Sequence, residues 1–300
     1  MILLEGKPAA EKIKADLTKQ VTALFDKKLR SPHLVAILIG NNGASETYVA
    51  SKIKNCAEID FQSSLIRFDA DVTEDTLLQK LDELNNDDAV DGILVQLPLP
   101  KHISEEKVIN TITPEKDVDG FHPVNLGKLA QGAPVFIPAT PYGIILLMLH
   151  YNIEARGKHA VVIGRSNIVG RPVSILLSSN QAYGNATVTI CHSHTANLKE
   201  LSLQADILVA ALGKPGFVTA DMVKQDAVVI DVGITRVQDA SAKKGFRIKG
   251  DVNFDEAAPK ASYITPVPGG VGLMTIAALL KNTMTAYLKR HNLSEAVFND

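Results

Sequence analysis

Residues 157–172 read Gly-Lys-His-Ala-Val-Val-Ile-Gly-Arg-Ser-Asn-Ile-Val-Gly-Arg-Pro, and this stretch decides the fold. Its apolar run 160–163 has the composition of a fully buried strand. Gly164 breaks the run, polar residues follow, and Gly170 begins a segment of helical character. Such a turn presents backbone N–H groups and a positive helix end to an anion, usually a phosphate. The stretch therefore predicts a phosphate-binding turn in an α/β domain.

The spacing departs from the dinucleotide fingerprint G-x-G-x-x-G, because five residues separate the two glycines. An ordinary strand-to-helix turn fits it equally well. The next predicted strand, 186–191, ends in His192-Ser193-His194, without the Asp or Glu that usually holds the ribose of NAD. Arg165 and Ser193 offer partners for a 2′-phosphate, so the sequence favours NADP over NAD. The two histidines are interpreted as a surface turn pair rather than as catalysts.

Composition narrows the class of protein. The chain has 300 residues, which predicts two domains at about 150 residues each. Its net charge is −2, and its basic residues are scattered, which argues against a nucleic-acid surface. Its two cysteines form neither a disulfide framework nor a zinc motif, and this suits a reducing compartment. The N-terminus does not resemble a signal peptide, and no apolar run approaches the ~20 residues of a membrane span. We expect a cytoplasmic protein without a metal site.

The first half alternates predicted helices and strands. A helix is expected over 9–29, and Ser45 and Thr73 are expected to cap two further helices. Short strands are expected over 34–39, 63–68 and 90–97.

The helix after Ser45 carries Tyr48, Lys52 and Cys56 at i, i+4 and i+8, which places them on one face. A Lys and a Tyr on a helix usually only point a polar tip at water, and spacing alone favours that interpretation. If the face lines a pocket, desolvation would lower the pKa of Lys52 and make it a usable base.

Two polar positions follow in the same half. Gln96 ends the predicted strand 90–97, at the edge where parallel α/β sheets bind ligands, or it simply leaves a buried strand. Asp117 and Asp119 alternate around Val118, and paired carboxylates suit acid–base work, a metal or an Asx turn. Composition leaves these alternatives open.

The second half repeats the alternation. Thr140 is expected to cap a linking helix, with Pro141 at its first position. Strands are expected over 160–163, 187–191, 207–210 and 228–232. Gly270 lies in a Pro/Gly-rich stretch that allows close approach of a ligand or makes a tight turn. The last helix is expected to return to the first domain.

Several long motifs in order resemble the bifunctional methylenetetrahydrofolate dehydrogenase/methenyltetrahydrofolate cyclohydrolase family over about residues 2–290. They are Tyr-Val-Ala-Ser-Lys at 48–52, Gly-Ile-Leu-Val-Gln-Leu-Pro-Leu-Pro at 92–100, Lys-Asp-Val-Asp-Gly-Phe-His-Pro-Val-Asn at 116–125, Gly-Arg-Ser-Asn-Ile-Val-Gly-Arg-Pro at 164–172 and Pro-Val-Pro-Gly-Gly-Val-Gly at 266–272. Together they are far more specific than one glycine turn.

The resemblance implies NADP-dependent oxidation of 5,10-methylenetetrahydrofolate, then hydrolysis of the methenyl product to 10-formyltetrahydrofolate. It implies an α/β protein with an N-terminal folate-binding catalytic domain over 1–139 and a C-terminal Rossmann-type NADP domain over 140–274. One folate site would occupy a cleft between the domains. The segment 275–300 would pack back onto the first domain. The resemblance also implies a homodimer.

Residue roles follow from the same resemblance. Lys52 matches the catalytic lysine, Gln96 the glutamine that hydrogen-bonds it, and Tyr48 the tyrosine that stacks on folate. Asp119 matches the aspartate that grips the pterin, and Gly270 is assigned to the substrate site, whereas Asp117 is expected to be structural. The positions that match the NADP site are Gly164, Arg165, Ser166, Ser193 and Ile234.

Three residues depart from the family pattern. Asp60 stands where Gly is usual, Ala139 where Cys is usual, and Leu273 where Pro is usual. Asp60 needs only to tolerate a left-handed backbone, as Asp does. Leu273 is expected to loosen the backbone beside the pocket and to affect folate affinity or the balance of the two activities. The alternatives are an NADP dehydrogenase without hydrolysis, a dehydrogenase of hydroxy or amino acids, and a nucleotide-binding protein without turnover.

Overall fold

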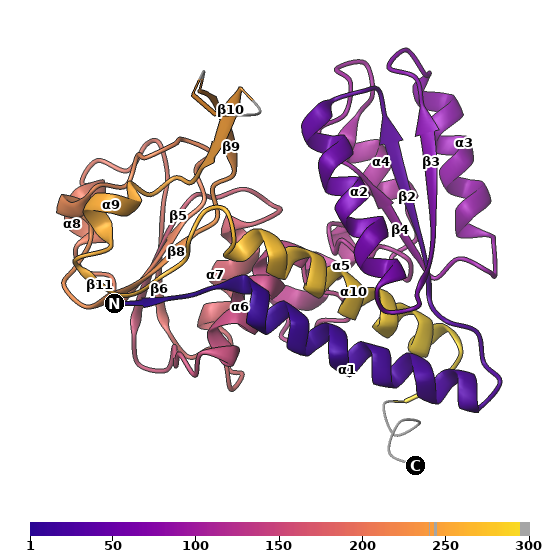
Figure 1. The fold of residues 1–300 in the computed structure, drawn as a ribbon, viewed down its shortest axis with the longest axis horizontal. Helices are drawn as coiled ribbons and strands as arrows, with labels where there is room; N and C mark the ends of the chain where they lie inside the picture. The colour runs from indigo at the N-terminus through magenta and orange to yellow at the C-terminus, as the bar shows by residue number, and fades with distance from the viewer. Residues whose placement is uncertain (240, 243–244, 295–300) are drawn as a thin grey trace. The chain divides into compact units, whose positions relative to one another are not determined.

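The computed structural model describes residues 1–239, 241–242 and 245–294. These residues divide into two compact units (Figure 1). Unit 1 comprises Met1–Glu11 and Thr140–Ala278, and unit 2 comprises Lys12–Ala139 and the residues from Leu279 onward. The predicted segment 275–300 ends in residues 295–300, which lie outside the described residues.

Unit 1 is built on a six-stranded sheet in which every pairing is parallel. In spatial order its strands are β1 (Ile2–Leu3), β11 (Ala261–Ile264), β8 (Ala227–Asp231), β7 (Ile207–Ala210), β5 (His159–Ile163) and β6 (Thr187–Cys191). Strands β5, β7 and β8 are buried almost throughout, as their apolar runs predict. The four strands predicted for the second half are confirmed to within one residue. The pairing of β1 with β11 joins the first residues of the chain to this sheet.

Helices and a hairpin complete unit 1. The helices are α6 (Ala139–His150), α7 (Gly170–Ser178), α8 (Leu198–Ser202), the 3₁₀ turn η1 (Ala220–Met222), α9 (Phe254–Ala257) and the start of α10 (Val271–Arg290). An antiparallel hairpin joins β9 (Thr235–Gln238) to β10 (Phe246–Lys249) and extends away from the sheet (Figure 1).

Helix α6 begins one residue before the predicted cap. The expectation that Thr140 is an N-cap is wrong, because Ala139 is already helical. The backbone N–H of Ala139 donates to the carbonyl of Asp119 at 3.2 Å, so a distant residue satisfies this helix start. The Thr140 hydroxyl instead lies 3.2 Å from that of Thr275.

Unit 2 contains a three-stranded parallel sheet in the order β3 (Gln62–Phe68), β2 (His33–Ile39), β4 (Gly92–Val95). Its helices are α1 (Gly6–Asp26, which begins in unit 1), α2 (Gly43–Ala57), α3 (Glu74–Asn85), α4 (Glu105–Thr111) and α5 (Pro123–Ala130). Figure 1 shows α2 and α3 on opposite sides of this sheet. Side chains of β2 and β4 form one apolar cluster with α3 and α4, including Val35, Ile37, Leu77, Ile93 and Val108.

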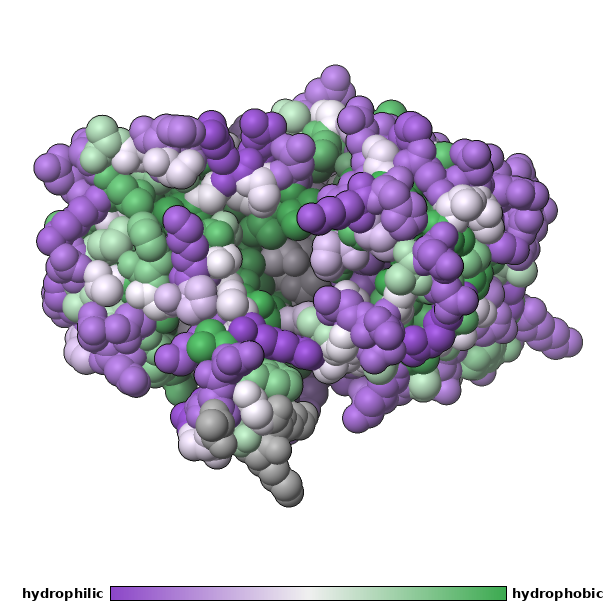
Figure 2. Space-filling model, turned by 90° about the horizontal axis from the view of Figure 1, so that it is seen from above, coloured by the Kyte–Doolittle hydropathy of each residue, from purple (hydrophilic) through white to green (hydrophobic). Residues whose placement is uncertain are grey.

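The end of α10 belongs to unit 2. The Asn282 side chain donates to the carbonyls of Val118 at 2.8 Å and Ile137 at 2.9 Å. Among the described helices, α10 is long and apolar enough to cross a membrane, but 72% of its apolar window is buried. Such burial is typical of a core helix. Hydrophilic residues prevail on the molecular face shown in Figure 2, with hydrophobic areas between them.

Candidate active site

Helix α2 carries the predicted lysine and begins three residues earlier than expected. Its N-cap is Asn42, whose side-chain oxygen accepts the N–H groups of Ala44 at 3.0 Å and Ser45 at 3.2 Å. The prediction that Ser45 is the N-cap is therefore wrong, and Ser45 lies buried within the first turn. The cap at Thr73 on α3 is confirmed.

The face of α2 that holds Lys52 is turned inward. Lys52 is only 8% exposed and Cys56 is fully buried, while Tyr48, one turn earlier, is partly buried. The pattern at i, i+4 and i+8 thus marks an inward face, and the solvated lysine that spacing alone favours is not observed.

Lys52 meets Gln96 across unit 2. The Lys52 ammonium donates to Gln96 Oε1 at 3.2 Å. Gln96 directly follows β4, and its backbone N–H donates to the carbonyl of Ile37 on β2 at 2.9 Å. Its side-chain amide donates to the carbonyl of Leu97 at 2.8 Å, which orients Oε1 toward the lysine. Gln96 thus holds the Lys52 ammonium in one position.

The charges around Lys52 set its chemistry. Burial lowers the pKa of Lys52 below its ordinary value, although the Asp119 carboxylate and Cys56 oppose that shift. Burial raises the pKa of Asp119, and the Lys52 charge counteracts this effect. Burial also raises the pKa of Cys56 to about 12, so this residue remains a thiol. The arrangement supplies a lysine able to lose a proton and a carboxylate within its electrostatic reach.

Asp117 holds the loop that carries Asp119. Its carboxylate accepts the N–H of Phe121 at 3.2 Å, the N–H of His122 at 2.8 Å and the side-chain amide of Asn125 at 2.8 Å. Asp117 is buried, and burial raises its pKa while these hydrogen bonds oppose the shift. These three hydrogen bonds lie within the loop and with α5, so Asp117 stabilises the conformation of the loop.

In unit 1, the turn between β5 and α7 requires both of its glycines. Gly164 has φ +136°, and a Cβ there would lie 2.3 Å from the carbonyl oxygen of Ala211. A Cβ at Gly170 would lie 2.2 Å from the carbonyl oxygen of Gly164. No side chain fits at either position, because the turn packs tightly against the backbone of Ala211 and against itself, so both glycines are needed for its shape.

The Ser166 side chain accepts hydrogen bonds from backbone N–H groups at the start of α7. Its hydroxyl accepts the N–H groups of Val169 at 3.2 Å and Gly170 at 3.3 Å. Arg165 and Ser166 are exposed beside this helix start. An exposed guanidinium at a helix N-terminus is a suitable partner for a phosphate.

Strand register brings the predicted cofactor residues to one edge of the sheet. Ile163 pairs with Cys191 and with Ala210, and Ala210 pairs with Asp231, so four neighbouring strands end together. The loops that follow contain the predicted residues Gly164, Arg165, Ser166, Ser193 and Ile234. Ser193 and Ile234 are exposed. This is the edge at which parallel α/β sheets bind ligands.

Arg165 also lies within electrostatic reach of the loop after β6. Burial lowers the pKa of His192, and the charges of Arg165 and His194 lower it further. The Arg165 guanidinium is therefore close to the loop after β6, where the sequence predicts a 2′-phosphate, and the lowered pKa keeps His192 neutral. The exposed Arg165 and Ser193 and the absence of a carboxylate at 192–194 all suit NADP.

Gly270 belongs to unit 1, whereas Tyr48, Lys52, Gln96 and Asp119 belong to unit 2. A Cβ at Gly270 would lie 2.8 Å from the carbonyl oxygen of Pro266. The neighbouring carbonyl of Gly269 accepts the N–H of Gly6 at 2.7 Å. The glycines of this stretch thus permit a tight turn against the start of α1, one of the two roles that the sequence leaves open.

Sequence reasoning assigned no role to the buried carboxylates Asp231 and Asp251. A single Asp that ends the apolar run of β8 is the signal that marks Asp231. In the described part of the chain, no three His, Cys, Asp or Glu side chains gather as a metal site would require.

Comparison with known proteins decides the family. The model of the tetrahydrofolate dehydrogenase/cyclohydrolase catalytic domain matches residues 4–119, and that of the NAD(P)-binding domain of the same family matches residues 138–291. The chain belongs to the tetrahydrofolate dehydrogenase/cyclohydrolase family. The fold class and the resemblance drawn from the motifs are thereby confirmed.

Close relatives of this family cover nearly the whole chain. The bifunctional protein FolD of Porphyromonas gingivalis is 58% identical over 284 residues, which are 95% of this chain and 96% of that protein. FolD of Bacteroides thetaiotaomicron is 56% identical over 286 residues, covering 95% and 98% of the two chains.

Solved structures of the tetrahydrofolate dehydrogenase/cyclohydrolase family also match. FolD of Campylobacter jejuni has a TM-score of 0.89 at 45% identity, over 96% of this chain and 99% of that chain. The Trypanosoma brucei methylenetetrahydrofolate dehydrogenase-cyclohydrolase, solved with NADP and an inhibitor, has a TM-score of 0.92 at 40% identity, over 98% and 99%. NADP is thus the cofactor found in a structurally similar member of the family.

Proposed function

We propose that this protein oxidises 5,10-methylenetetrahydrofolate to 5,10-methenyltetrahydrofolate with NADP⁺ and hydrolyses the product to 10-formyltetrahydrofolate. The observation that carries the proposal is the buried Lys52 held 3.2 Å from Gln96 and within electrostatic reach of Asp119. Relatives named as bifunctional enzymes, at 56–58% identity over nearly the whole chain, support two activities rather than one.

Binding of the folate falls to Asp119 and Tyr48. An ionised Asp119 accepts two N–H bonds from the amino-pyrimidine edge of the pterin, a charge-assisted bidentate contact. The Tyr48 ring stacks on the folate, and Gly270 contributes backbone to the substrate site. These contacts fix the folate, and placement contributes strongly to a reaction of this kind.

The oxidation needs orientation more than a strong base. When bound, NADP⁺ would supply the acceptor for the hydride of the one-carbon bridge, whose departure the lone pair of the folate nitrogen assists. Gly164, Arg165, Ser166, Ser193 and Ile234 would hold the nucleotide at the carboxyl edge of the unit 1 sheet. Among these, Arg165 and Ser193 would hold the 2′-phosphate that separates NADP from NAD.

The hydrolysis adds water to the cationic methenyl group, and a proton must leave. Lys52 is suited to receive that proton, because burial lowers its pKa. Gln96 keeps the Lys52 side chain oriented while the charge on the lysine changes.

An assay of the purified protein tests the proposal. Reduction of NADP⁺ with methylenetetrahydrofolate, together with loss of methenyltetrahydrofolate when supplied alone, is the expected result. Oxidation without hydrolysis would instead identify a monofunctional dehydrogenase, and inactivity in both assays would refute the folate assignment.

We also propose a cytoplasmic homodimer that binds tetrahydrofolate derivatives, without nucleic-acid or membrane partners. The near-neutral net charge argues against a nucleic-acid partner, and the two buried free thiols suit a reducing compartment. The homodimer is proposed from the family resemblance. Light scattering during gel filtration is expected to give about twice the mass of one chain. A single-chain mass would contradict the dimer.

A further inference from the structure

Asp231 ties down both ends of the β9–β10 hairpin. It is the last residue of β8, it is 4% exposed, and its Oδ1 accepts the N–H groups of Gly233 at 2.9 Å and Asp251 at 2.8 Å. Its Oδ2 accepts the N–H of Val252 at 2.9 Å. Gly233 precedes β9, and the other two donors follow β10. One carboxylate therefore holds the chain where it enters and where it leaves the hairpin.

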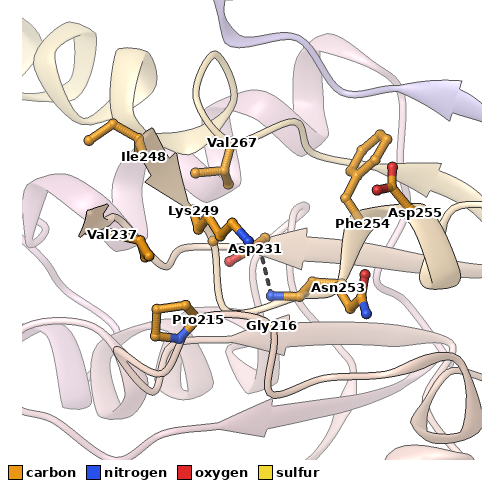
Figure 3. A pocket seen from close by; sticks show the side chains of 12 residues that line it. Pro215, Gly216, Asp231, Val237, Ile248, Lys249, Asn253, Phe254, Asp255 and Val267 are labelled. Atoms are coloured by element: carbon orange, nitrogen blue, oxygen red, sulfur yellow. Dashed lines mark hydrogen bonds between the residues drawn. The ribbon is translucent and has the colours of Figure 1, made fainter. Parts of the chain in front are cut away.

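The carboxylate has little freedom to move. A Cβ at Gly250 would lie 1.9 Å from Asp231 Oδ2, so only glycine fits beside it. The backbone N–H of Asp231 donates to the hydroxyl of Thr265, the residue that follows β11, at 2.7 Å, and this contact also fixes the end of β8. Figure 3 shows Asp231 among the residues that line a pocket of about 460 Å³, with a hydrogen bond drawn at its carboxylate.

A second carboxylate extends the connection to the loop after β7. Asp251 Oδ2 accepts the N–H groups of Leu212 at 2.6 Å and Gly213 at 2.9 Å. Asp251 is fully buried, and its Oδ1 has no hydrogen-bond partner among the described residues. Asp231 and Asp251, which are linked by a hydrogen bond, thus hold three segments together. These are the loop after β7, the loop after β8 and the segment that follows β10.

Burying a carboxylate is costly, and the three N–H donors offset only part of that cost. Burial raises the pKa of Asp231 to about 6, although the three backbone hydrogen bonds oppose the shift. At neutral pH the group is still mostly ionised and accepts all three hydrogen bonds. A leucine or valine of similar size would leave these three N–H groups without an acceptor, so the carboxylate at this position serves to hold the two ends of the hairpin.

We propose that Asp231 is a positioning residue for NADP, which fixes the backbone of Gly233 and thereby the side chain of Ile234. This inference rests on the proposed function, because Ile234 is assigned to the cofactor site. Ile234 is 41% exposed at the carboxyl edge of the sheet, one residue beyond the amide that Asp231 holds. Released from Asp231, the segment that carries Ile234 would no longer be preorganised for the nucleotide.

Asp231→Asn tests the proposal with little change in size. The asparagine oxygen can accept from only one set of donors, and its NH₂ group meets the N–H of Val252, donor against donor; we expect this repulsion to displace the side chain from the N–H groups of Gly233 and Asp251 as well. We expect the KM for NADP⁺ to rise about tenfold, which corresponds to the loss of one charge-assisted hydrogen bond. Hydrolysis of methenyltetrahydrofolate without nucleotide is expected to stay within about twofold of the wild-type rate.

Asp226→Asn is the matched control. Asp226 is exposed and immediately precedes β8, and its substitution removes the same single negative charge. We expect it to leave both activities unchanged. An unchanged KM for NADP⁺ in Asp231→Asn would overturn the proposal, as would an equal fall of oxidation and hydrolysis, because that pattern indicates general destabilisation.

Hydrogen exchange on the wild-type protein gives a test that needs no variant. NADP⁺ is expected to slow amide exchange at Gly233–Ile234 and also at Asp251–Val252. Protection at the first pair alone would show that the two ends of the hairpin are not coupled, and would overturn the proposal. If the wild type does not oxidise methylenetetrahydrofolate at all, the proposed function fails, and that outcome is distinct from either result above.

Discussion

Lys52 Nζ lies 3.2 Å from Gln96 Oε1, although 44 residues separate them in the sequence. The lysine is fixed by α2 and the glutamine by the end of β4, so two regular elements set the distance. A polar pair on such elements is positioned more precisely than a pair on loops.

Lys52→Met should separate the two activities. Hydrolysis loses its proton acceptor and should fall by about 10²- to 10⁴-fold, the usual contribution of general acid–base catalysis. Oxidation should remain measurable, because it depends on placement of the folate rather than on a base. The two initial rates, measured by absorbance with methenyltetrahydrofolate alone and with NADP⁺ plus methylenetetrahydrofolate, check this expectation. Lys54→Met, at an exposed position on the same helix, is the control, and an equal loss of both rates in Lys52→Met would contradict the assignment.

Asp119→Asn should shift the pH profile of hydrolysis toward acid. The Asp119 carboxylate raises the pKa of Lys52 and thereby opposes the effect of burial. Removing that charge lowers the lysine pKa further, so the neutral amine appears at lower pH and kcat rises earlier. The measurement is kcat at saturating folate across the pH range, and Asp75→Asn on the exposed first turn of α3 is the control. A profile that stays in place or moves toward alkaline pH would argue against electrostatic coupling.

Arg165→Gln should weaken discrimination between NADP⁺ and NAD⁺. Loss of the guanidinium removes a charged partner of the 2′-phosphate, so the KM for NADP⁺ should rise about tenfold or more while that for NAD⁺ changes little. Arg171→Gln is the matched control, because Arg171 lies close by and its guanidinium is engaged with Asn167 at 2.9 Å. Equal effects of Arg165→Gln on both nucleotides would count against a 2′-phosphate contact.

Lys116 should make the free energy of unfolding increase with pH in the alkaline range. It is 2% exposed, its ammonium donates to the carbonyls of Leu84 and Asp87 at 2.7 Å each, and burial lowers its pKa from 10.5 to about 8. Between these values the unfolded state binds more protons, so this group makes the free energy of unfolding rise with pH. From about pH 7.5 to about pH 9.5 the gain should be about 2 kcal/mol.

Lys116→Met should lack that gain. Because the chain has no Trp, urea unfolding followed by circular dichroism at the two pH values is the suitable measurement. Lys128→Met on α5 is a control that leaves Lys116 in place. An equal pH slope in the wild type and in Lys116→Met would show that the buried amine does not titrate in this range.

Local sequence rules succeeded where a short-range cause decides the structure. The buried strands β5 and β8 follow from apolar runs ended by Gly164 and by Asp231, and Thr73 caps α3 with its own hydroxyl. Asp60 has φ +58°, the left-handed conformation that the sequence allowed for it. In each case the neighbouring residues suffice.

Helix starts were less predictable. Asn42 and Ser45 are both good cap residues, and the path of the chain leaving β2 gives the extended backbone to Asn42. The first turn of α6 is satisfied by the carbonyl of Asp119, twenty residues away, so a cap at Thr140 is not needed.

The sequence by itself determined the α/β class, most strands, the glycine turn between β5 and α7, and the family. Periodicity and motif spacing are local properties of the chain, and they survive without any knowledge of contacts. Only the tertiary structure decided that Lys52 is buried beside Gln96 and that β1 joins the large sheet. It alone also showed that Asp231 holds both ends of the hairpin. Burial, a shifted pKa and a long-range hydrogen bond depend on what packs against a side chain, and local sequence does not specify that neighbour.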